Sequence, residues 1–299
     1  MKYQVKVLVT GVTGKTGRRV AESLVNRGVG VRALVRDIER GKMATLGMGV
    51  ELVLGDFDDP QSIETALKGC DSVFIVSVDN ERQVEQEIGV AKLAKKAGLG
   101  HIVKLSSSDA GDRPYAWSVA HAEIEAAISE IGVPYSFIRP HYFMQNYVSL
   151  LKVDSAGVVT LDAPANDGEI GAIDAYDIGE CAAALLANDD ALNGHALLTG
   201  SENISMERVA AAFSSAIDQE ISYVNLDPKA YLTELETDDS GSAKDIADVY
   251  EEVRVGTMAV NSNNVERITG NKPRSIEQYA IENQDAIKST IERVSASSN

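Results

Sequence analysis

Three glycines near the N-terminus carry the clearest chemical signal. Gly11, Gly14 and Gly17 follow an apolar, β-branched run at residues 5–9 and precede a segment with helical apolar spacing. A strand, a glycine turn and a helix start suit a phosphate, because the backbone N–H groups of the first helical turn point at the anion. The pattern predicts a dinucleotide site, although a tight turn without a ligand would read the same way. The expected contacts in this loop are Gly11, Thr13, Gly14, Lys15, Thr16 and Gly17.

Arg36 is the residue that bears on the choice of dinucleotide. It ends the second apolar run, 19 positions after Gly17, where an acidic residue would accept hydrogen bonds from the adenosine ribose of NAD. A guanidinium favours a 2′-phosphate instead, through paired charge-assisted bonds. The sequence therefore predicts a preference for NADP(H) over NAD(H). Asp37 follows directly and argues the other way, and a solvated charge at a strand end is the alternative for Arg36.

Later strand ends supply further candidate contacts. Asp56 follows the third apolar run and is placed to accept from an adenine amino group, with Phe57 beside the ring. Asp56 could otherwise belong to the capping region of the next helix, where Asp58 or Asp59 is the expected cap. The remaining cofactor-side candidates at the next two strand ends are Ser77, Val78 and Ser106.

The spacing of these runs determines the expected fold class. Strands alternate with helices about every 25 residues up to residue 146, which is typical of a doubly wound, Rossmann-type parallel α/β sheet. We expect residues 1–150 to form the dinucleotide-binding domain, with 168–200 returning to it. The remainder of 151–299 is expected to form a smaller α/β substrate-binding domain.

Composition and charge exclude several classes of partner. Residues 1–155 contain 19 acidic and 19 basic residues, so the whole net charge of −17 falls on residues 156–299. Such a surface repels nucleic acid and anionic lipid, and no apolar run is long enough to span a bilayer. Two cysteines and four histidines without ligand spacing predict no metal site. We expect a cytoplasmic protein acting on a small-molecule substrate, with a homodimer or a regulatory protein partner possible.

Several segments together resemble the NmrA-like family of atypical short-chain dehydrogenases. They are VTGVTGKTG, Arg36, GDFDD, AKKAGLGHIVKLSSS, HAEIEAAISEIGVPYSFIRPHYFMQN and AIDAYDIGE, spread over about residues 1–190. The resemblance implies a Rossmann-type domain that binds NADP(H) and a small C-terminal domain. It also implies a range of activities. Some members reduce quinones, azo or triphenylmethane dyes or phenylpropanoids, and others are redox-sensing regulators.

The catalytic candidates are weaker than the cofactor contacts. The Tyr-x-x-x-Lys pair of ordinary short-chain dehydrogenases is missing, since Tyr115 is followed four residues later by Val119. In isoflavone-reductase-like members a lysine stands at the position that His121 occupies here. An imidazole with a pKa near neutral can hold or give a proton. We therefore expect His121 as a proton donor or as a polar neighbour of the nicotinamide ribose.

Three further residues complete the candidate site. Tyr142 is a second candidate donor and cofactor contact, Ser107 a candidate for orienting a substrate oxygen, and Phe143 a candidate cofactor contact and apolar wall. Hydride transfer to a quinone or conjugated acceptor needs little acid catalysis, because the cofactor does the chemistry. The favoured hypothesis is an NADPH-dependent oxidoreductase that reduces a small planar carbonyl, quinone or conjugated acceptor. The alternative is a non-enzymatic NADP(H)-sensing regulator.

Overall fold

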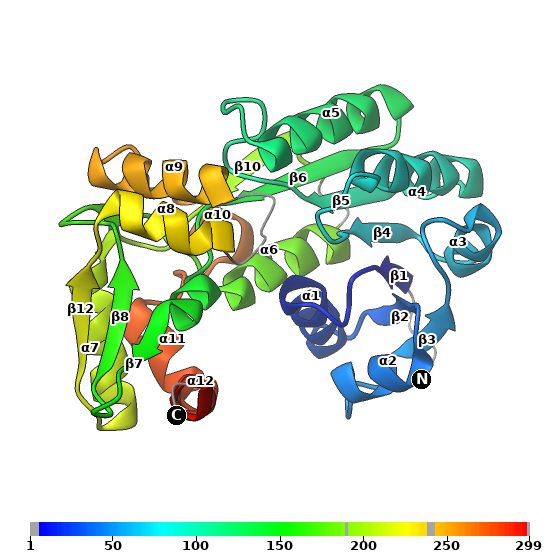
Figure 1. Cartoon of the computed structure of the whole chain (residues 1–299). Coiled ribbons are helices and arrows are strands. Elements are labelled where there is room, and N and C mark those ends of the chain that lie inside the picture. The colour runs from blue at the N-terminus through cyan, green and yellow to red at the C-terminus, as the bar shows by residue number, and fades with distance from the viewer. Residues whose placement is uncertain (1–5, 189–190, 238–242, 298–299) are drawn as a thin grey trace. The chain divides into compact units, whose positions relative to one another are not determined.

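The larger of two compact units is built around a seven-stranded parallel sheet (Figure 1). A computed structural model describes residues 6–188, 191–237 and 243–297, so Val5 of the first apolar run lies outside it. The strand order is β10-β6-β5-β4-β1-β2-β3, and every neighbouring pair is parallel. The strands are β1 (Lys6–Val9), β2 (Gly30–Val35), β3 (Glu51–Leu54), β4 (Ser72–Ile75), β5 (His101–Leu105), β6 (Tyr135–Pro140) and β10 (Gly194–Leu198).

Strand β1 lies between β2 and β4, so the chain reverses its direction of travel across the sheet at this point. Val9 is opposite Ala33 on one side and Phe74 on the other, and its side chain is fully buried. In a doubly wound sheet, the crevice beyond the carboxyl end of such a strand is where ligands bind. The expected Rossmann-type α/β fold is confirmed.

The helices of this unit form two packed groups, as expected for a doubly wound sheet with helices on both faces. Helices α1 and α6 pack against each other, and α4 packs against both α3 and α5. The apolar faces of α3, α4 and α5 and the strands share a core that includes Leu8, Val73 and Ile102. The helices of this unit are α1 (Lys15–Asn26), α2 (Ile38–Ala44), α3 (Pro60–Leu67), α4 (Gln83–Ala97), α5 (Ala116–Ile131), α6 (Ala175–Ala187) and α10 (Asn264–Thr269).

The second compact unit is smaller and has its own core. In its three-stranded mixed sheet β8 lies in the centre, parallel to β12 and antiparallel to β7, and β9 pairs separately with β11. Its core gathers Tyr147, Phe213 and Tyr279. Its elements are η1 (Met144–Leu150), β7 (Leu151–Val153), β8 (Val159–Ala163), β9 (Glu169–Ile170), β11 (Ile204–Ser205), α7 (Met206–Ile217), β12 (Ile221–Asn225), α8 (Pro228–Thr237), α9 (Ala243–Arg254), α11 (Ile276–Glu282) and α12 (Gln284–Ser297).

The limits of the two units differ from the expected 1–150 and 168–200. The larger unit ends its first stretch at Pro140, takes back Ala175–Leu198 and also includes Asn264–Asn271. The segment 168–174 belongs to the smaller unit, where β9 pairs with β11. Over the described residues, no helix combines the length and hydropathy that a membrane span requires.

Candidate cofactor site

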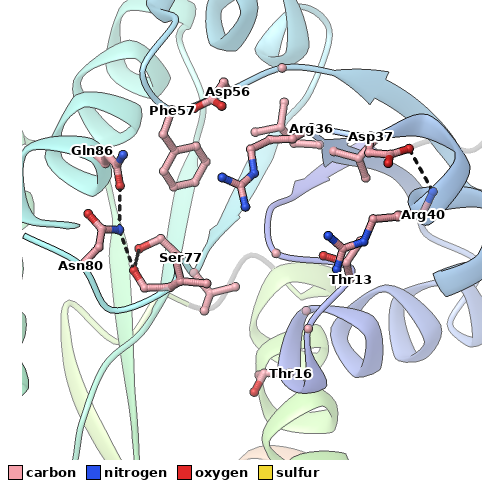
Figure 2. A pocket seen from close by; sticks show the side chains of 18 of the residues that line it. Thr13, Thr16, Arg36, Asp37, Arg40, Asp56, Phe57, Ser77, Asn80 and Gln86 are labelled. Carbon is pink, nitrogen blue, oxygen red and sulfur yellow. Dashed lines mark hydrogen bonds between the residues drawn. The ribbon is translucent and has the colours of Figure 1, made fainter. Parts of the chain in front are cut away.

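A pocket of about 510 Å³ opens at the carboxyl ends of β1, β2, β3 and β4 in the larger unit (Figure 2). It lies where the strand order reverses, and it is large enough to hold much of a dinucleotide. Eleven of the predicted cofactor contacts line it: Gly11, Thr13, Gly14, Lys15, Thr16, Gly17, Arg36, Asp56, Phe57, Ser77 and Val78.

The three glycines of the first loop have different reasons to be glycine. Gly11 has a φ of +63°, and a Cβ there would lie 2.6 Å from the Val76 side chain. A Cβ on Gly17 would lie 2.4 Å from the Gly11 carbonyl oxygen, so the approach of α1 to the turn requires a glycine. Gly14 has an ordinary φ of −94°, and its Cβ would meet nothing closer than 3.3 Å. Folding alone therefore explains Gly11 and Gly17 better than it explains Gly14.

Gly14 is the N-cap of α1 and faces the pocket. No side chain caps this helix, so the first-turn N–H groups of Lys15, Thr16 and Gly17 are left to a ligand or to water. A glycine at the cap leaves these amides open to an anion, and the helix dipole favours negative charge at this end. The loop thus fits a diphosphate by its backbone geometry.

Three cations line the pocket: Lys15, Arg36 and Arg40. Within the described residues, none of their side chains forms a hydrogen bond or an ion pair. Figure 2 shows the side chains of Arg36 and Phe57 directed into the same part of the pocket, with Arg40 following on the first turn of α2. Unpaired guanidinium groups at a pocket wall are suited to bind a phosphate dianion.

Asp37, which follows Arg36, has a structural role at the start of α2. Its carboxylate is the N-cap of α2 and accepts from the backbone N–H of Glu39 at 2.8 Å and of Arg40 at 3.2 Å. Asp56 is not a helix cap, since Asp59 caps α3, and its Oδ1 accepts from the Asp58 N–H at 3.0 Å. Neither carboxylate forms an ion pair with a pocket cation in this structure.

A polar chain of hydrogen bonds forms the wall opposite α2. The Asn80 amide donates to the Val78 carbonyl at 2.9 Å and to Gln86 at 3.2 Å, and Gln86 in turn donates to Asp58 at 2.8 Å. Figure 2 shows this wall with Ser77 beside Asn80. It holds the loop after β4 in place, although no motif in the sequence marked Asn80 or Gln86.

The predicted contacts after β5 do not line the pocket. The Ser106 hydroxyl donates to Glu125, which also binds the Arg139 guanidinium at 2.9 and 2.6 Å. The Ser107 hydroxyl donates to Asp109, whose second oxygen accepts from the Trp117 indole at 3.0 Å. Both hydroxyls therefore have partners within the protein.

His121 is placed differently from what its residue type suggested. It lies on α5, outside the pocket, and its Nδ1 is 2.8 Å from the Nζ of Lys104 on β5. Burial, together with the charges of Lys104 and Arg139, lowers the pKa of His121 to about 3. The expectation of a near-neutral pKa is thus wrong for this environment, and the ring is neutral at physiological pH.

Tyr142 and Phe143 belong to the smaller unit. The Tyr142 hydroxyl is 3.2 Å from that of Tyr250, and burial raises the pKa of Tyr142 to about 12. Phe143 forms a bridge with Ile173. Tyr142 thus keeps its proton at neutral pH and already has a hydroxyl partner.

Reasoning from the sequence missed several pocket residues, above all Arg40. Arg40 could have been predicted from its position four residues after Arg36, on the first turn of the next helix. The other missed lining residues are Leu34, Val35, Asp37, Gly55, Val76, Asn80 and Gln86. In the part of the chain that the structure describes, no three His, Cys, Asp or Glu side chains are grouped as metal ligands.

Known proteins match this chain in sequence or in structure over almost its whole length. A (4-alkanoyl-5-oxo-2,5-dihydrofuran-3-yl)methyl phosphate reductase of Streptomyces griseus is 32% identical over 288 residues, which are 94% of this chain and 98% of the relative. An NAD(P)H azoreductase of Xenophilus azovorans is 28% identical over 92% of this chain and 96% of its own. An NADPH-dependent quinone oxidoreductase of Escherichia coli, solved with NADPH, superimposes with a TM-score of 0.78 at 22% identity, covering 92% and 99% of the two chains.

All three relatives are named as reductases or oxidoreductases, and two of the names include NAD(P)H or NADPH. The matches extend over both units and are not limited to the dinucleotide-binding half. The model of the NmrA-like family matches residues 3–280. The glycine loop, the seven-stranded sheet and this match agree, and the chain belongs to the NmrA-like family of NAD(P)-binding oxidoreductases.

Proposed function

We propose that this protein is an NADPH-dependent reductase that transfers a hydride to a small, planar, conjugated acceptor. The observation that carries the proposal is the pocket beyond β1 and β2. It combines the open amides at the start of α1 with two guanidinium groups that have no partner among the described residues. A pyrophosphate and an adenosine 2′-phosphate present the charges that these two groups of donors match.

The preference for NADPH rests on Arg36 and Arg40 together with Asp37. In an NAD-specific pocket, a carboxylate after the second strand accepts from the ribose hydroxyls. The Asp37 carboxylate is held by two backbone N–H groups of α2. Rotating it toward a ribose would uncap the helix, at a cost of about 1 kcal/mol.

The acceptor class follows from the names of the relatives and from the residues that are missing here. The Streptomyces griseus substrate contains a ring C=C conjugated to carbonyls, and an azo compound contains a conjugated N=N. Such acceptors accept a hydride without a strong acid, since the resulting anion is delocalised. The reduced nicotinamide supplies the hydride when it is bound, and a chain without the Tyr-x-x-x-Lys pair mainly binds, orients and excludes water.

The test is to measure binding and turnover side by side. The affinities of NADPH and NADH are determined by calorimetry, and a panel of enones, butenolides, quinones and azo dyes is screened by following the absorbance of reduced nicotinamide. We expect NADPH to bind at least tenfold tighter and to be oxidised in the presence of at least one conjugated acceptor. Equal affinity for both cofactors would contradict the role given to Arg36 and Arg40.

A redox-sensing regulator is the second candidate, favoured by the missing Tyr-x-x-x-Lys pair and by the net charge of −17 carried by residues 156–299. In this case the protein binds NADPH tightly but oxidises it with no acceptor of the panel. A difference in affinity between NADPH and NADP⁺ is then expected, because a sensor has to distinguish the two redox states.

A further inference from the structure

A buried charged network lies on β5, α4, α5 and the loop after β4, beside the pocket. Lys104 and Glu87 have side chains that are 0% and 1% exposed, and Lys104 Nζ lies 3.0 Å from Glu87 Oε2. Glu87 Oε1 accepts from the Ser77 hydroxyl at 2.8 Å and from the Ser77 N–H at 3.2 Å. Ser77 also lines the pocket, so the network reaches from the pocket wall to His121.

Lys104 makes two hydrogen bonds in addition to its ion pair with Glu87. Besides Glu87, the Nζ donates to the Leu105 carbonyl oxygen at 2.6 Å and lies 2.8 Å from His121 Nδ1. An ammonium has no lone pair, so His121 Nδ1 must be the acceptor of this bond. A neutral amine could instead accept from an Nδ1–H, but it would leave the Glu87 carboxylate without a counter-charge in the protein interior.

We propose that Lys104 is a positioning residue that holds His121 in the neutral tautomer with its proton on Nε2. The imidazole is then a permanent hydrogen-bond donor at Nε2 and transfers no proton as an imidazolium. Among the described residues, this Nε2 has no partner.

The surroundings of His121 support this assignment from each neighbouring element. Lys104 on β5 and Arg139 on β6 are cations that disfavour a second proton on the ring. Glu87 on α4 is paired with Lys104, and Glu125 on α5 is paired with Arg139. Asp79, in the loop after β4, has a pKa that is raised by burial and by Glu87. Glu87 and Glu125 are thus each paired with one of the two cations that act on the ring.

The consequence for the reaction rests on the proposed function. A neutral Nε2–H can polarise an acceptor oxygen or nitrogen through a hydrogen bond, while the proton that completes the product comes from water. This restricts the acceptor class to compounds whose anion is stable once the hydride has arrived, such as quinones and conjugated carbonyls, and disfavours simple ketones.

The test is nitrogen NMR of the full chain with ¹⁵N-labelled histidine, without substrate, so that it does not depend on turnover. His121→Gln assigns the His121 signals, and the exposed His195 on β10 is the internal control. We expect the His121 pattern of an unprotonated Nδ1 and a protonated Nε2 from pH 8 down to pH 5, with the exposed His195 recorded in the same spectra for comparison. A protonated Nδ1, or an imidazolium at pH 6, would overturn the proposal.

Two variants test the part played by Lys104. Lys104→Met removes the donor but leaves Glu87 buried without its counter-charge, so Lys104→Met/Glu87→Gln is made beside it as a version without a buried unpaired charge. In both, the His121 tautomers should mix and the His121 pKa should rise from about 3, while the His195 signals stay unchanged. An unaltered His121 spectrum in the double variant would show that Lys104 does not set the tautomer.

The pH profile of turnover gives a second readout. In the wild type, kcat with a quinone should be flat through the usual histidine range, and in the double variant a titration should appear there. A wild-type kcat that falls as His121 titrates would contradict the proposal. If no acceptor is turned over, the proposed function fails, but the NMR result still decides the tautomer.

Discussion

The cofactor pocket and the buried network around Lys104 both contain cationic side chains, but those in the pocket lack partners in the described part of the chain and the one in the network is paired. In the pocket, Arg36 and Arg40 point into solvent-accessible space and have no ion-pair partner among the described residues. In the network, Lys104 makes two hydrogen bonds and an ion pair with Glu87, whose side chain is 1% exposed. One region keeps its charges available to a ligand, and the other uses them to fix a side chain. Removing a charged side chain from the pocket should therefore alter binding with little effect on stability, and removing one from the network should do the reverse.

The largest effect is expected from Lys104→Met. Removing one partner of a buried ion pair leaves Glu87 uncompensated, which costs about 3–5 kcal/mol of the free energy of unfolding. Chemical denaturation measures the loss, and adding Glu87→Gln should restore much of it. NADPH affinity should change far less than stability. A Lys104→Met protein of wild-type stability would break the comparison.

The next effect concerns Arg36→Ala combined with Arg40→Ala. Each lost charge-assisted bond to a phosphate costs about 1.5–3 kcal/mol, so NADPH affinity should fall by roughly 100-fold or more, while NADH affinity stays nearly constant. Calorimetric titration with both cofactors measures this. Arg18→Ala is the matched control, an exposed arginine on α1 that does not line the pocket. Stability within about 0.5 kcal/mol of the wild type is expected for all three changes.

Two glycines of the first loop, Gly14 and Gly17, allow the same comparison between binding and stability at positions three residues apart. Gly17→Ala places a Cβ 2.4 Å from a carbonyl oxygen and should cost about 1–3 kcal/mol of stability. Gly14→Ala meets nothing closer than 3.3 Å, so stability should stay within about 0.5 kcal/mol while NADPH binds roughly tenfold more weakly. Thermal denaturation and NADPH titration of both variants decide the matter. Equal losses of affinity and stability at Gly14 would mean that the turn, and not a ligand, requires this glycine.

The smallest effect is the pH dependence that His121 brings to stability. Its pKa is about 3 in the folded protein against 6.5 for an ordinary histidine, so only the unfolded chain takes up this proton between those values. The free energy of unfolding should therefore fall as pH drops below about 6.5, by at most about 1.4 kcal/mol per pH unit from this residue. Denaturation curves of the wild type and His121→Gln at pH 7 and pH 5 isolate the difference. The variant should lose less stability over this range.

The predicted residues that the structure brings together around the pocket are those whose position depends on local chain geometry. The glycine loop, Arg36, Asp56, Phe57 and Ser77 lie at strand ends, and parallel strands bring such ends to one edge of the sheet. Asp59 caps α3, as one of the two acidic residues expected there. The missed residues are of another kind. Arg40 enters the pocket only because Asp37 starts α2 where it does, and Asn80 belongs to a loop with no motif.

By itself, the sequence determined the doubly wound sheet and predicted both the strand ends that form the pocket and the cation on which the proposed NADPH preference rests. Short apolar runs, glycines and a charge at a strand end act through neighbours a few residues away, so their pattern is enough. Only the tertiary structure decided the state of His121. Its pKa depends on burial and on the charges of Lys104 and Arg139, and the ring is hydrogen-bonded to Lys104; these cations come from two other elements of the chain. Burial and charge pairing arise from contacts distant in sequence, and no local pattern encodes them.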